Sequence, residues 1–286
     1  MRDGRGTRRV TTIRIASYNT RDFLEDPYAA ARVVRAIDPD VLCLQEVPRR
    51  LFSTQRVANF ARNCGMYWSG RHRGSGGTTI FTSLRVDVVE SRHQRLRVAL
   101  LQRTRGFALA RVAAPGREPI AVASVHLSLD ARERAAHAQV ILEAVNVGGE
   151  VVLAGDLNEN ETGRAWQAFA GVMRPVSPMT PTFPATRPRR VLDVIFASPG
   201  LQAEPHVPIP IPEADLVAGS DHRPTWVDIR LGEPSATQER AEEASARASE
   251  TVTEEMVQEA EGAAAETTAE DPAAAQPEVT DPGPRT

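Results

Sequence analysis

The chain has 286 residues, 41% of them hydrophobic, which is enough for one large domain with a substantial core. Two cysteines do not make a disulfide framework, and no apolar run is long enough to span a bilayer, so disulfide-stapled secreted domains and membrane-spanning proteins are excluded. The charged N-terminus lacks the apolar run of a signal peptide, and we expect a cytoplasmic protein.

The formal net charge of −3 is unevenly distributed. Residues 233–286 hold fourteen acidic residues, three arginines and no aromatic residue, a balance of −11, so residues 1–232 carry +8. We expect an acidic disordered tail over 233–286 and a flexible N-terminus over 1–11. A solvating role suits such a tail best; the alternative is a tail that covers a basic face and mimics nucleic acid.

The first elements of the body, residues 12–232, alternate between strand and helix patterns. A β-like run at 12–19 is followed by a helix to about Ile37, which Asp26 caps and Pro27 opens. A buried strand is expected at 41–47 and a helix from about Leu51 to Asn63. This alternation is typical of an α/β domain.

The second half of the body is richer in strands. We expect strands at 78–84, 85–91, 95–103, 106–113 and 119–127, then a helix at 131–145 and strands at 151–157, 191–198 and 225–231. Many strands with interspersed helices predict large, mixed sheets.

Polar residues fall where several of these apolar runs stop. They are Asn19, Glu46, His126, Asp156, Asn158 and Asp193, with Ser220, Asp221 and His222 just before the last strand. Strand ends are rigid positions from which side chains can converge on a cleft. Each residue alone could be a turn, a cap or a core histidine. Together they are better explained by mutual pairing or by a metal ion, because unpaired buried acids are costly.

Six segments resemble the motifs of one superfamily, in the same order. They are SYN (17–19), DVLCLQEV (40–47), SVHLSL (124–129), AGDLNEN (154–160), LDVIFAS (192–198) and GSDHRP (219–224). The set is similar to the endonuclease/exonuclease/phosphatase superfamily of DNase-like phosphoesterases. The resemblance covers residues 12–232 and implies a four-layer α/β sandwich, with two mixed sheets face to face and helices outside.

The same resemblance implies a divalent-metal site. Glu46 would be the main ligand, with Asn19 beside it and Asp221 contributing. Carboxylate and amide oxygens suit a hard cation, so the expected cofactor is Mg²⁺ or Mn²⁺.

The remaining motif residues receive catalytic or substrate-binding roles from the resemblance. Asp156 would take a proton from the attacking water, and Asn158 would orient that water or the phosphate. His126 and His222 would contact the phosphate, with Asp193 holding His222 in place. Arg134 and Ser220 are also expected to bind substrate, although for Arg134 a solvated helix face is an equal alternative.

The sequence differs from the motifs of some relatives in two places, and the first difference indicates which branch of the superfamily it resembles. Apurinic/apyrimidinic-site endonucleases typically carry Asp at the position of Arg21 and Tyr at that of His126, so the resemblance favours the histidine-bearing branch of nucleases, sphingomyelinases and small-molecule or inositol phosphatases. Thr78 follows Gly77 where many relatives have Asn, which removes one expected substrate contact.

The substrate is open at this point. The positive body and clusters such as Arg49–Arg50 and Arg103–Arg105 favour a phosphodiesterase or nuclease acting on a polyanion such as nucleic acid, although a solvated surface explains them too. Against nucleic acid, only Tyr67–Trp68 offers aromatic stacking near a basic cluster. The alternatives are a phosphatase of small phosphomonoesters or phosphoinositides, and a catalytically silent binding module. Nothing in the sequence sets the oligomeric state.

Overall fold

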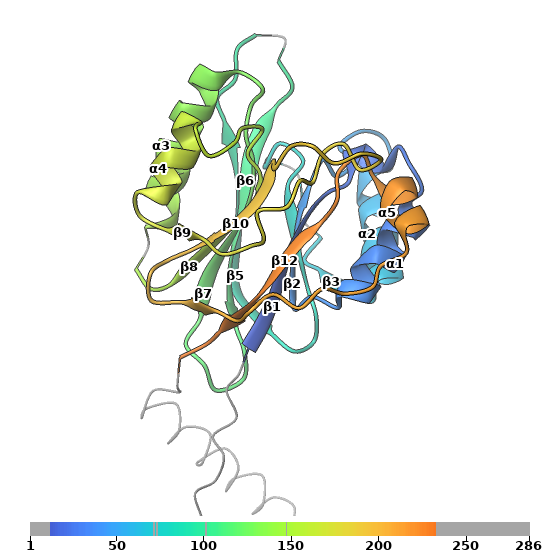
Figure 1. The fold of residues 1–286 in the computed structure, drawn as a ribbon, viewed down its shortest axis with the longest axis horizontal. Helices are drawn as coiled ribbons and strands as arrows, with labels where there is room; N and C mark the ends of the chain where they lie inside the picture. Colours follow the sequence, from blue (N-terminus) through green and yellow to red (C-terminus); the bar gives the residue numbers. More distant parts are fainter. Residues whose placement is uncertain (1–11, 71, 73, 101, 147, 233–286) are drawn as a thin grey trace, which may run out of the picture. The chain divides into compact units, whose positions relative to one another are not determined.

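Two mixed β-sheets of six strands each form the centre of the protein in a computed structural model (Figure 1). The structure describes residues 12–232 apart from 71, 73, 101 and 147. The expected flexible N-terminus (1–11) and acidic tail (233–286) lie outside the described residues.

The first sheet has the strand order β11-β12-β1-β2-β4-β3. Its strands are β1 (Thr12–Asn19), β2 (Val41–Gln45), β3 (Tyr67–Trp68), β4 (Thr79–Thr82), β11 (Gln202–Ala203) and β12 (Thr225–Arg230). Only the β1–β2 pair is parallel. Both strands of that pair therefore end at the same edge of the sheet, with Asn19 level with Gln45.

The second sheet has the order β5-β6-β7-β8-β10-β9. Its strands are β5 (Asp87–Leu96), β6 (Arg105–Ala113), β7 (Ile120–His126), β8 (Val151–Asp156), β9 (Arg174–Pro175) and β10 (Asp193–Ala197). Here β7 and β8 form the parallel pair, so they also end together. The register brings His126 level with Asp156, and Asp156 level with Asp193.

Helices cover the outer faces of both sheets, which gives the expected four layers (Figure 1). The helices are α1 (Pro27–Ile37), α2 (Ser53–Cys64), α3 (Ala131–Val145), α4 (Arg164–Ala170) and α5 (Glu213–Gly219), with a short 3₁₀ helix η1 (Arg21–Phe23). Helices α1 and α2 pack on the first sheet, whereas α3 and α4 pack on the second. Asp26 caps α1 as expected, because its side chain accepts a hydrogen bond from the amide of Tyr28 at 2.8 Å.

A core of small and β-branched residues fills the space between the sheets. Ile15 and Val41 of the first sheet belong to one buried cluster with Val122, Val152 and Ile195 of the second. These residues alternate along their strands with residues that face the helices, as expected for sheets that are buried on both faces. Burial of this apolar surface holds the two parallel strand pairs together.

One expected strand was wrong. The expected separate strand is absent among the described residues of 95–103: β5 extends to Leu96, and residues 97–100 and 102–104 lie outside any strand. The apolar residues of this segment suggested a strand, but pairing of β5 with β6 ends at Leu96–Arg105, and Leu100 is exposed rather than packed in the core. The short strands β3, β9 and β11 and the helices α4 and α5 were not expected. No helix among the described residues is long and apolar enough to cross a membrane.

Candidate active site

The ends of the two parallel strand pairs bring the expected polar residues together at one edge of the sandwich. Asn19 ends β1, Glu46 follows β2, His126 ends β7 and Asp156 ends β8. The two sheets are joined here by a hydrogen bond of 3.0 Å from the side-chain amide (Nδ2) of Asn19 to Asp156 Oδ2. The candidate site therefore lies across both sheets.

Asp156 is the centre of this arrangement. The residue is 1% exposed, and its Oδ1 accepts a hydrogen bond from the backbone amide of Asn158 at 2.9 Å. Its Oδ2 lies 3.5 Å from His126 Nε2 and 3.8 Å from His222 Nε2. Burial raises the pKa of Asp156 to about 6, against the opposing effect of His222. The carboxyl can therefore exchange a proton near neutral pH.

A glycine allows Asp156 to reach this position. A Cβ atom at Gly155 would lie 1.9 Å from the carbonyl oxygen of Val125, on the neighbouring strand β7. No larger residue fits without separating β7 from β8. The glycine thus permits the close strand pairing that sets His126 beside Asp156.

His126 is held in a fully buried position between two carboxylates. Its Nε2 lies 3.8 Å from Glu46 Oε1 in addition to its contact with Asp156, and its Nδ1 has no hydrogen-bond partner among the described residues. Burial, followed by the charge of Arg105, lowers the pKa of His126 well below its usual value. His126 is therefore a neutral imidazole, and the neighbouring carboxylates favour a proton on Nε2.

His222 has the opposite character. Its Nδ1 lies 2.8 Å from Asp193 Oδ2, which also accepts a hydrogen bond of 2.6 Å from the hydroxyl of Thr182. Burial alone would lower the pKa of His222, but the charges of Asp193 and Asp156 outweigh it and raise the pKa to about 10. The ring of Phe183 lies against the imidazole, with 4.8 Å between ring centroids. His222 is thus a fixed imidazolium whose Nε2 faces the site.

The three expected metal ligands, Asn19, Glu46 and Asp221, are related to one another through Arg21. Asn19 Oδ1 accepts a hydrogen bond from the amide of Arg21, whose guanidinium lies 3.3 Å from Asp221 Oδ2. The hydrogen bond with Glu25, then the charge of Asp221 and lastly that of Glu46, raise the pKa of Arg21. Arg21 thus contacts two of the candidate ligands, Asn19 and Asp221, and is influenced by the charge of the third, Glu46.

The chemistry of these donors fits a hard cation. Glu46 and Asp221 are partly exposed carboxylates, and their cationic partners are the half-exposed side chains of Arg103 and Arg21. An ion that enters from solvent can displace such partners. Glu46 has a left-handed backbone conformation, with φ of 51°. This conformation is uncommon for a residue with a side chain and recurs at functional sites.

A second group of potential ligand atoms occurs in the same site. One atom each of Asp156, Asp193 and His222 lies within 4.8 Å of the others. Asp193 Oδ2 already accepts two hydrogen bonds, from Thr182 and from His222 Nδ1, whereas the buried Asp193 Oδ1 has no hydrogen-bond partner among the described residues. We interpret this group as an acid–base cluster on the basis of these hydrogen bonds, and it is the second position in the site that could hold a cation.

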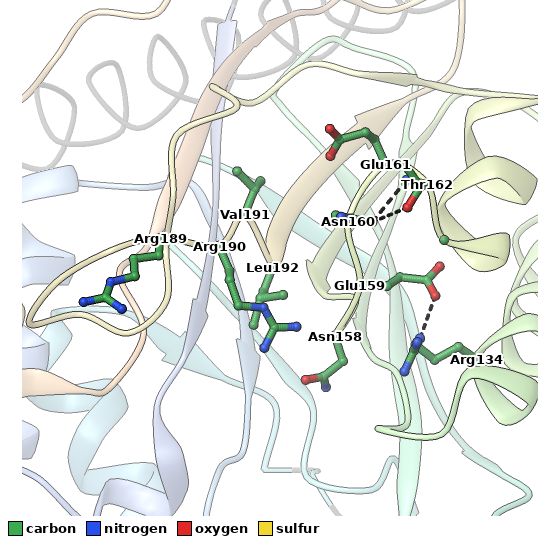
Figure 2. Close-up of a pocket in the computed structure, with 11 residues that line it drawn as sticks. Arg134, Asn158, Glu159, Asn160, Glu161, Thr162, Arg189, Arg190, Val191 and Leu192 are labelled. Atoms are coloured by element: carbon green, nitrogen blue, oxygen red, sulfur yellow. Dashed lines mark hydrogen bonds and ion pairs between the residues drawn. The ribbon is translucent and has the colours of Figure 1, made fainter.

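Asn158 connects this cluster to a pocket of about 540 Å³ (Figure 2). The side chain of Asn158 donates to the carbonyl of Leu127 at 3.1 Å, and its backbone is left-handed. Figure 2 shows Arg134 and Arg190 on opposite sides of Asn158. The pocket is thus lined by three arginines, Arg134, Arg189 and Arg190, and reaches Asn158, a residue that contacts Asp156.

Arg134 and Ser220 were expected to bind substrate, but both side chains make contacts within the protein. The guanidinium of Arg134 makes an ion pair of 2.6 Å with Glu159, a buried carboxylate that also caps α4. The hydroxyl of Ser220 is fully buried and donates to the carbonyl of Asn19 at 2.7 Å. Arg134 still lines the pocket, whereas Ser220 joins the segment that carries His222 to the end of β1.

Sequence reasoning missed the roles of Thr182 and Arg105. Thr182 precedes Asp193 by eleven residues, and only the fold brings its hydroxyl to that carboxylate. Arg105 was read as part of a basic surface, but it is 5% exposed and donates to the carbonyl of Leu127 at 2.9 Å. Burial lowers the pKa of Arg105, while Glu46 and Asp156 oppose this change, so a buried cation lies beside the site.

Comparison with known proteins supports the architecture. The sequence model of the Endonuclease/Exonuclease/phosphatase family matches residues 16–222. No curated protein matches the chain in sequence.

Solved structures are similar in fold at low sequence identity. An endonuclease/exonuclease/phosphatase from Bacteroides vulgatus has a TM-score of 0.63 and 20% identity, over 78% of this chain and 100% of that chain. A mannosyl-6-phosphatase from Bacteroides thetaiotaomicron has a TM-score of 0.58 and 19% identity, over 76% and 99%. The human nocturnin catalytic domain has a TM-score of 0.57 and 20% identity, over 77% and 95%.

Proposed function

The chain belongs to the endonuclease/exonuclease/phosphatase family, and from this premise we propose that it is a divalent-metal-dependent phosphodiesterase that hydrolyses its ester by water attack. One observation carries the proposal. Two imidazoles, those of His126 and His222, present Nε2 to the same oxygen of Asp156, at 3.5 and 3.8 Å. A phosphoryl group needs such a combination of a base and hydrogen-bond donors.

Asp156 acts as the general base in this mechanism. Its Oδ2 takes a proton from the attacking water as the oxygen of that water bonds to phosphorus, the bond from phosphorus to the leaving ester oxygen breaks, and the released alkoxide takes a proton from solvent. The pKa of about 6 makes the carboxylate the main form at neutral pH while it remains a stronger base than an exposed aspartate. The hydrogen bonds from Asn158 and Asn19 orient the carboxylate toward the site.

The two histidines stabilise the charge that develops on the phosphoryl oxygens. His222 donates a charged hydrogen bond from Nε2, and Asp193 with Thr182 keeps its ring in place. His126 donates from a neutral ring. Both donors are held by the protein before the substrate arrives, so little reorganisation is needed in the transition state.

Asn19, Glu46 and Asp221 would hold the metal ion, Mg²⁺ or Mn²⁺. When bound, the ion polarises a phosphoryl oxygen and offsets negative charge in the transition state. Ser220 is a positioning residue in this account, because its hydroxyl fixes the carbonyl of Asn19.

The pocket next to Asn158 provides space for an organic group of a diester substrate. A diester has an organic group on each side of phosphorus, and this pocket of about 540 Å³ can take one of them. Arg190 lies on its border and has no side-chain partner among the described residues, so it is available for an anionic group of the substrate. A monoesterase is the second candidate, because the Bacteroides thetaiotaomicron structure of the same fold is a mannosyl-6-phosphatase.

Parallel assays of two chromogenic esters test this proposal. The proposal predicts that bis-p-nitrophenyl phosphate, a diester, is hydrolysed with Mg²⁺ or Mn²⁺, and that p-nitrophenyl phosphate is hydrolysed much more slowly. Faster hydrolysis of the monoester would replace the diesterase with a phosphatase. Hydrolysis of neither ester, and of no DNA, RNA or phospholipid, would favour the silent module.

A further inference from the structure

The strand β5 forms one edge of the second sheet, and its outer side has no neighbouring strand among the described residues. It is ten residues long, and all of its residues except Leu96 are exposed or half-buried. Natural proteins usually shorten or cover such an edge, because an open row of backbone N–H and C=O groups pairs readily with another chain. This long, uncovered edge strand is therefore a candidate interaction surface.

Exposed apolar side chains lie beside this edge. Val88 and Val89 of β5 are exposed, as are Leu84 in the preceding turn and Tyr67 of β3. Val88 and Tyr67 line one cavity of about 250 Å³, and because β3 and β5 are edge strands of different sheets, this cavity lies where the two sheet edges meet. Apolar surface next to an open strand edge is typical of an interaction site.

The charges of β5 indicate which partner fits. Its acidic residues, Asp87 and Glu90, lie in the first half of the strand, and its arginines, Arg92 and Arg95, lie in the second half. The strand therefore has no net charge, but its two halves are oppositely charged. A second copy of β5 that runs antiparallel sets each acidic half against a basic half, whereas a parallel copy in register sets like charges together. The strand is thus complementary to itself rather than to a polyanion.

One register of the antiparallel pair satisfies these charges. A two-fold axis through Ser91 places Glu90 of one copy opposite Arg92 of the other, and the axis repeats this pair on its other side. An axis through Glu90 or through Arg92 instead places two like charges directly opposite each other, which is unfavourable. Arg92 donates one hydrogen bond to the carbonyl of Ala144 at 2.6 Å, so its other N–H groups remain for the carboxylate of the second copy.

An irregularity in β5 is compatible with this register. The pairing of β5 with β6 shifts between Val88 and Glu90, so Val89 is an extra residue in the strand. This bulge lies outside the three central pairs of the register centred on Ser91. Beyond those pairs, the two exposed valines of one copy come beside His93 of the other, which lines the cavity. The pairing therefore covers apolar side chains that are otherwise in water.

We propose that the protein forms a homodimer in which two copies of β5 pair antiparallel about Ser91, so that the second sheets of both copies become one continuous sheet. The interface is isologous, because both copies use the same surface. It satisfies the backbone groups of the open edge and removes Val88 and Val89 from water. The inference concerns assembly and does not depend on the proposed hydrolysis.

Sedimentation equilibrium of the full chain tests the dimer, and charge reversal tests its register. We expect the wild-type chain to dimerise with increasing concentration. Glu90→Arg and Arg92→Glu should each raise the dissociation constant about tenfold, because each turns two attractive cross-strand pairs into repulsive ones. An equal mixture of the two variants should recover the dimer, since opposite charges then face each other again. The matched control, Glu118→Arg, reverses an exposed charge between β6 and β7 and should dimerise as the wild type does.

Ser91→Cys provides a second measurement that does not disturb the charges. Directly opposed residues of an antiparallel pair have Cα atoms about 4.5–5.5 Å apart, which is within the range that a disulfide spans. Oxidation should therefore link two copies of this variant covalently. The wild-type chain should not be linked, because its two cysteines, Cys43 and Cys64, are buried.

Several outcomes would overturn the inference. A wild-type chain that stays monomeric at its highest soluble concentration would leave the edge to a strand of another protein and exclude the dimer. A dimer that survives both Glu90→Arg and Arg92→Glu, or that Glu118→Arg weakens equally, would use a different surface. Variants that do not combine in the mixture, or Ser91→Cys that does not cross-link, would exclude the register centred on Ser91. Circular dichroism of each variant distinguishes these outcomes from a failure to fold.

Discussion

At the scale of single residues, the candidate site depends on how one carboxylate is surrounded. Asp156 accepts from two amides and faces two imidazoles, and burial keeps its proton affinity high. The environment also separates the two histidines, because Asp193 touches His222 but not His126. A neutral and a charged donor therefore occupy one site.

The first prediction concerns the general base. Asp156→Asn keeps the shape of the side chain but cannot accept a proton, so kcat should fall about 10²–10⁴-fold. The midpoint of thermal unfolding should change little. As a control, Asp87→Asn alters an exposed carboxylate at the far end of β5 and should keep full activity. Wild-type turnover by Asp156→Asn would remove the assigned role of Asp156.

The second prediction concerns pH. Activity needs Asp156 deprotonated and His222 protonated, so the rate should rise with pH through about 6 and fall through about 10. Asp193→Asn removes a charge that raises the pKa of His222, so the alkaline limb should move to lower pH while the acid limb moves less. A pH–rate profile measures both limbs. An unmoved alkaline limb would show that Asp193 does not act through His222.

The sequence identified the residues that end apolar runs but not those that support them. Asp156 and His126 are conspicuous because a charged or imidazole side chain interrupts a buried pattern. Thr182 and Arg105 have no such local signal. Their importance comes from contacts between segments that only the fold brings together, such as Thr182 with Asp193 and Arg105 with the carbonyl of Leu127.

At the scale of elements, the parallel strand pairs determine where the site forms. β1 with β2, and β7 with β8, end at the same edge, and close pairing of β7 with β8 depends on Gly155. The pairing of the strands thus determines which side chains can meet at the site.

The third prediction tests this pairing. In Gly155→Ala the new methyl group meets the carbonyl oxygen of Val125 at 1.9 Å, and overpacking of this kind costs about 1–3 kcal/mol of unfolding free energy. Activity should fall as well, because His126 and Asp156 would separate. Urea denaturation measures the loss. The control Gly171→Ala adds a methyl group at ordinary contact distance, 3.4 Å from the carbonyl of Gln167, and should be nearly neutral.

The expected elements were confirmed where the pattern was long and strongly periodic. The helices at α1 and α3 and the strands β7, β8 and β12 lie within a few residues of their expected ranges. The strand expected at 95–103 was wrong, because apolar residues there are exposed on a loop rather than packed in a sheet. A run of apolar residues indicates that a strand could form, but it does not show that the folded chain buries those residues.

At the scale of the whole molecule, the two sheets contribute different parts of one site. The first sheet carries the candidate metal ligands, the second carries His126 and Asp156, and the hydrogen bond from Asn19 to Asp156 joins them. The order of the six motifs therefore indicated the fold class, and family membership confirmed it.

The fourth prediction follows from the proposed metal site. Mn²⁺ or Mg²⁺ should raise the midpoint of thermal unfolding, because an ion that binds only the folded chain stabilises it by mass action. Glu46→Gln should lose most of this shift. Glu161→Gln, a change of an exposed glutamate in the neighbouring pocket, should keep it. An equal shift in Glu46→Gln and the wild type would place the ion elsewhere, with the group of Asp156, Asp193 and His222 as the next position to test.

The measurement that tests the central claim most directly is the rate of bis-p-nitrophenyl phosphate hydrolysis by the full chain, with Mg²⁺ or Mn²⁺ and with excess chelator. The account predicts hydrolysis that the chelator abolishes, that added metal restores, and that Asp156→Asn lacks under every condition. Hydrolysis that survives the chelator, or that Asp156→Asn retains, would contradict a metal-dependent phosphodiesterase centred on Asp156.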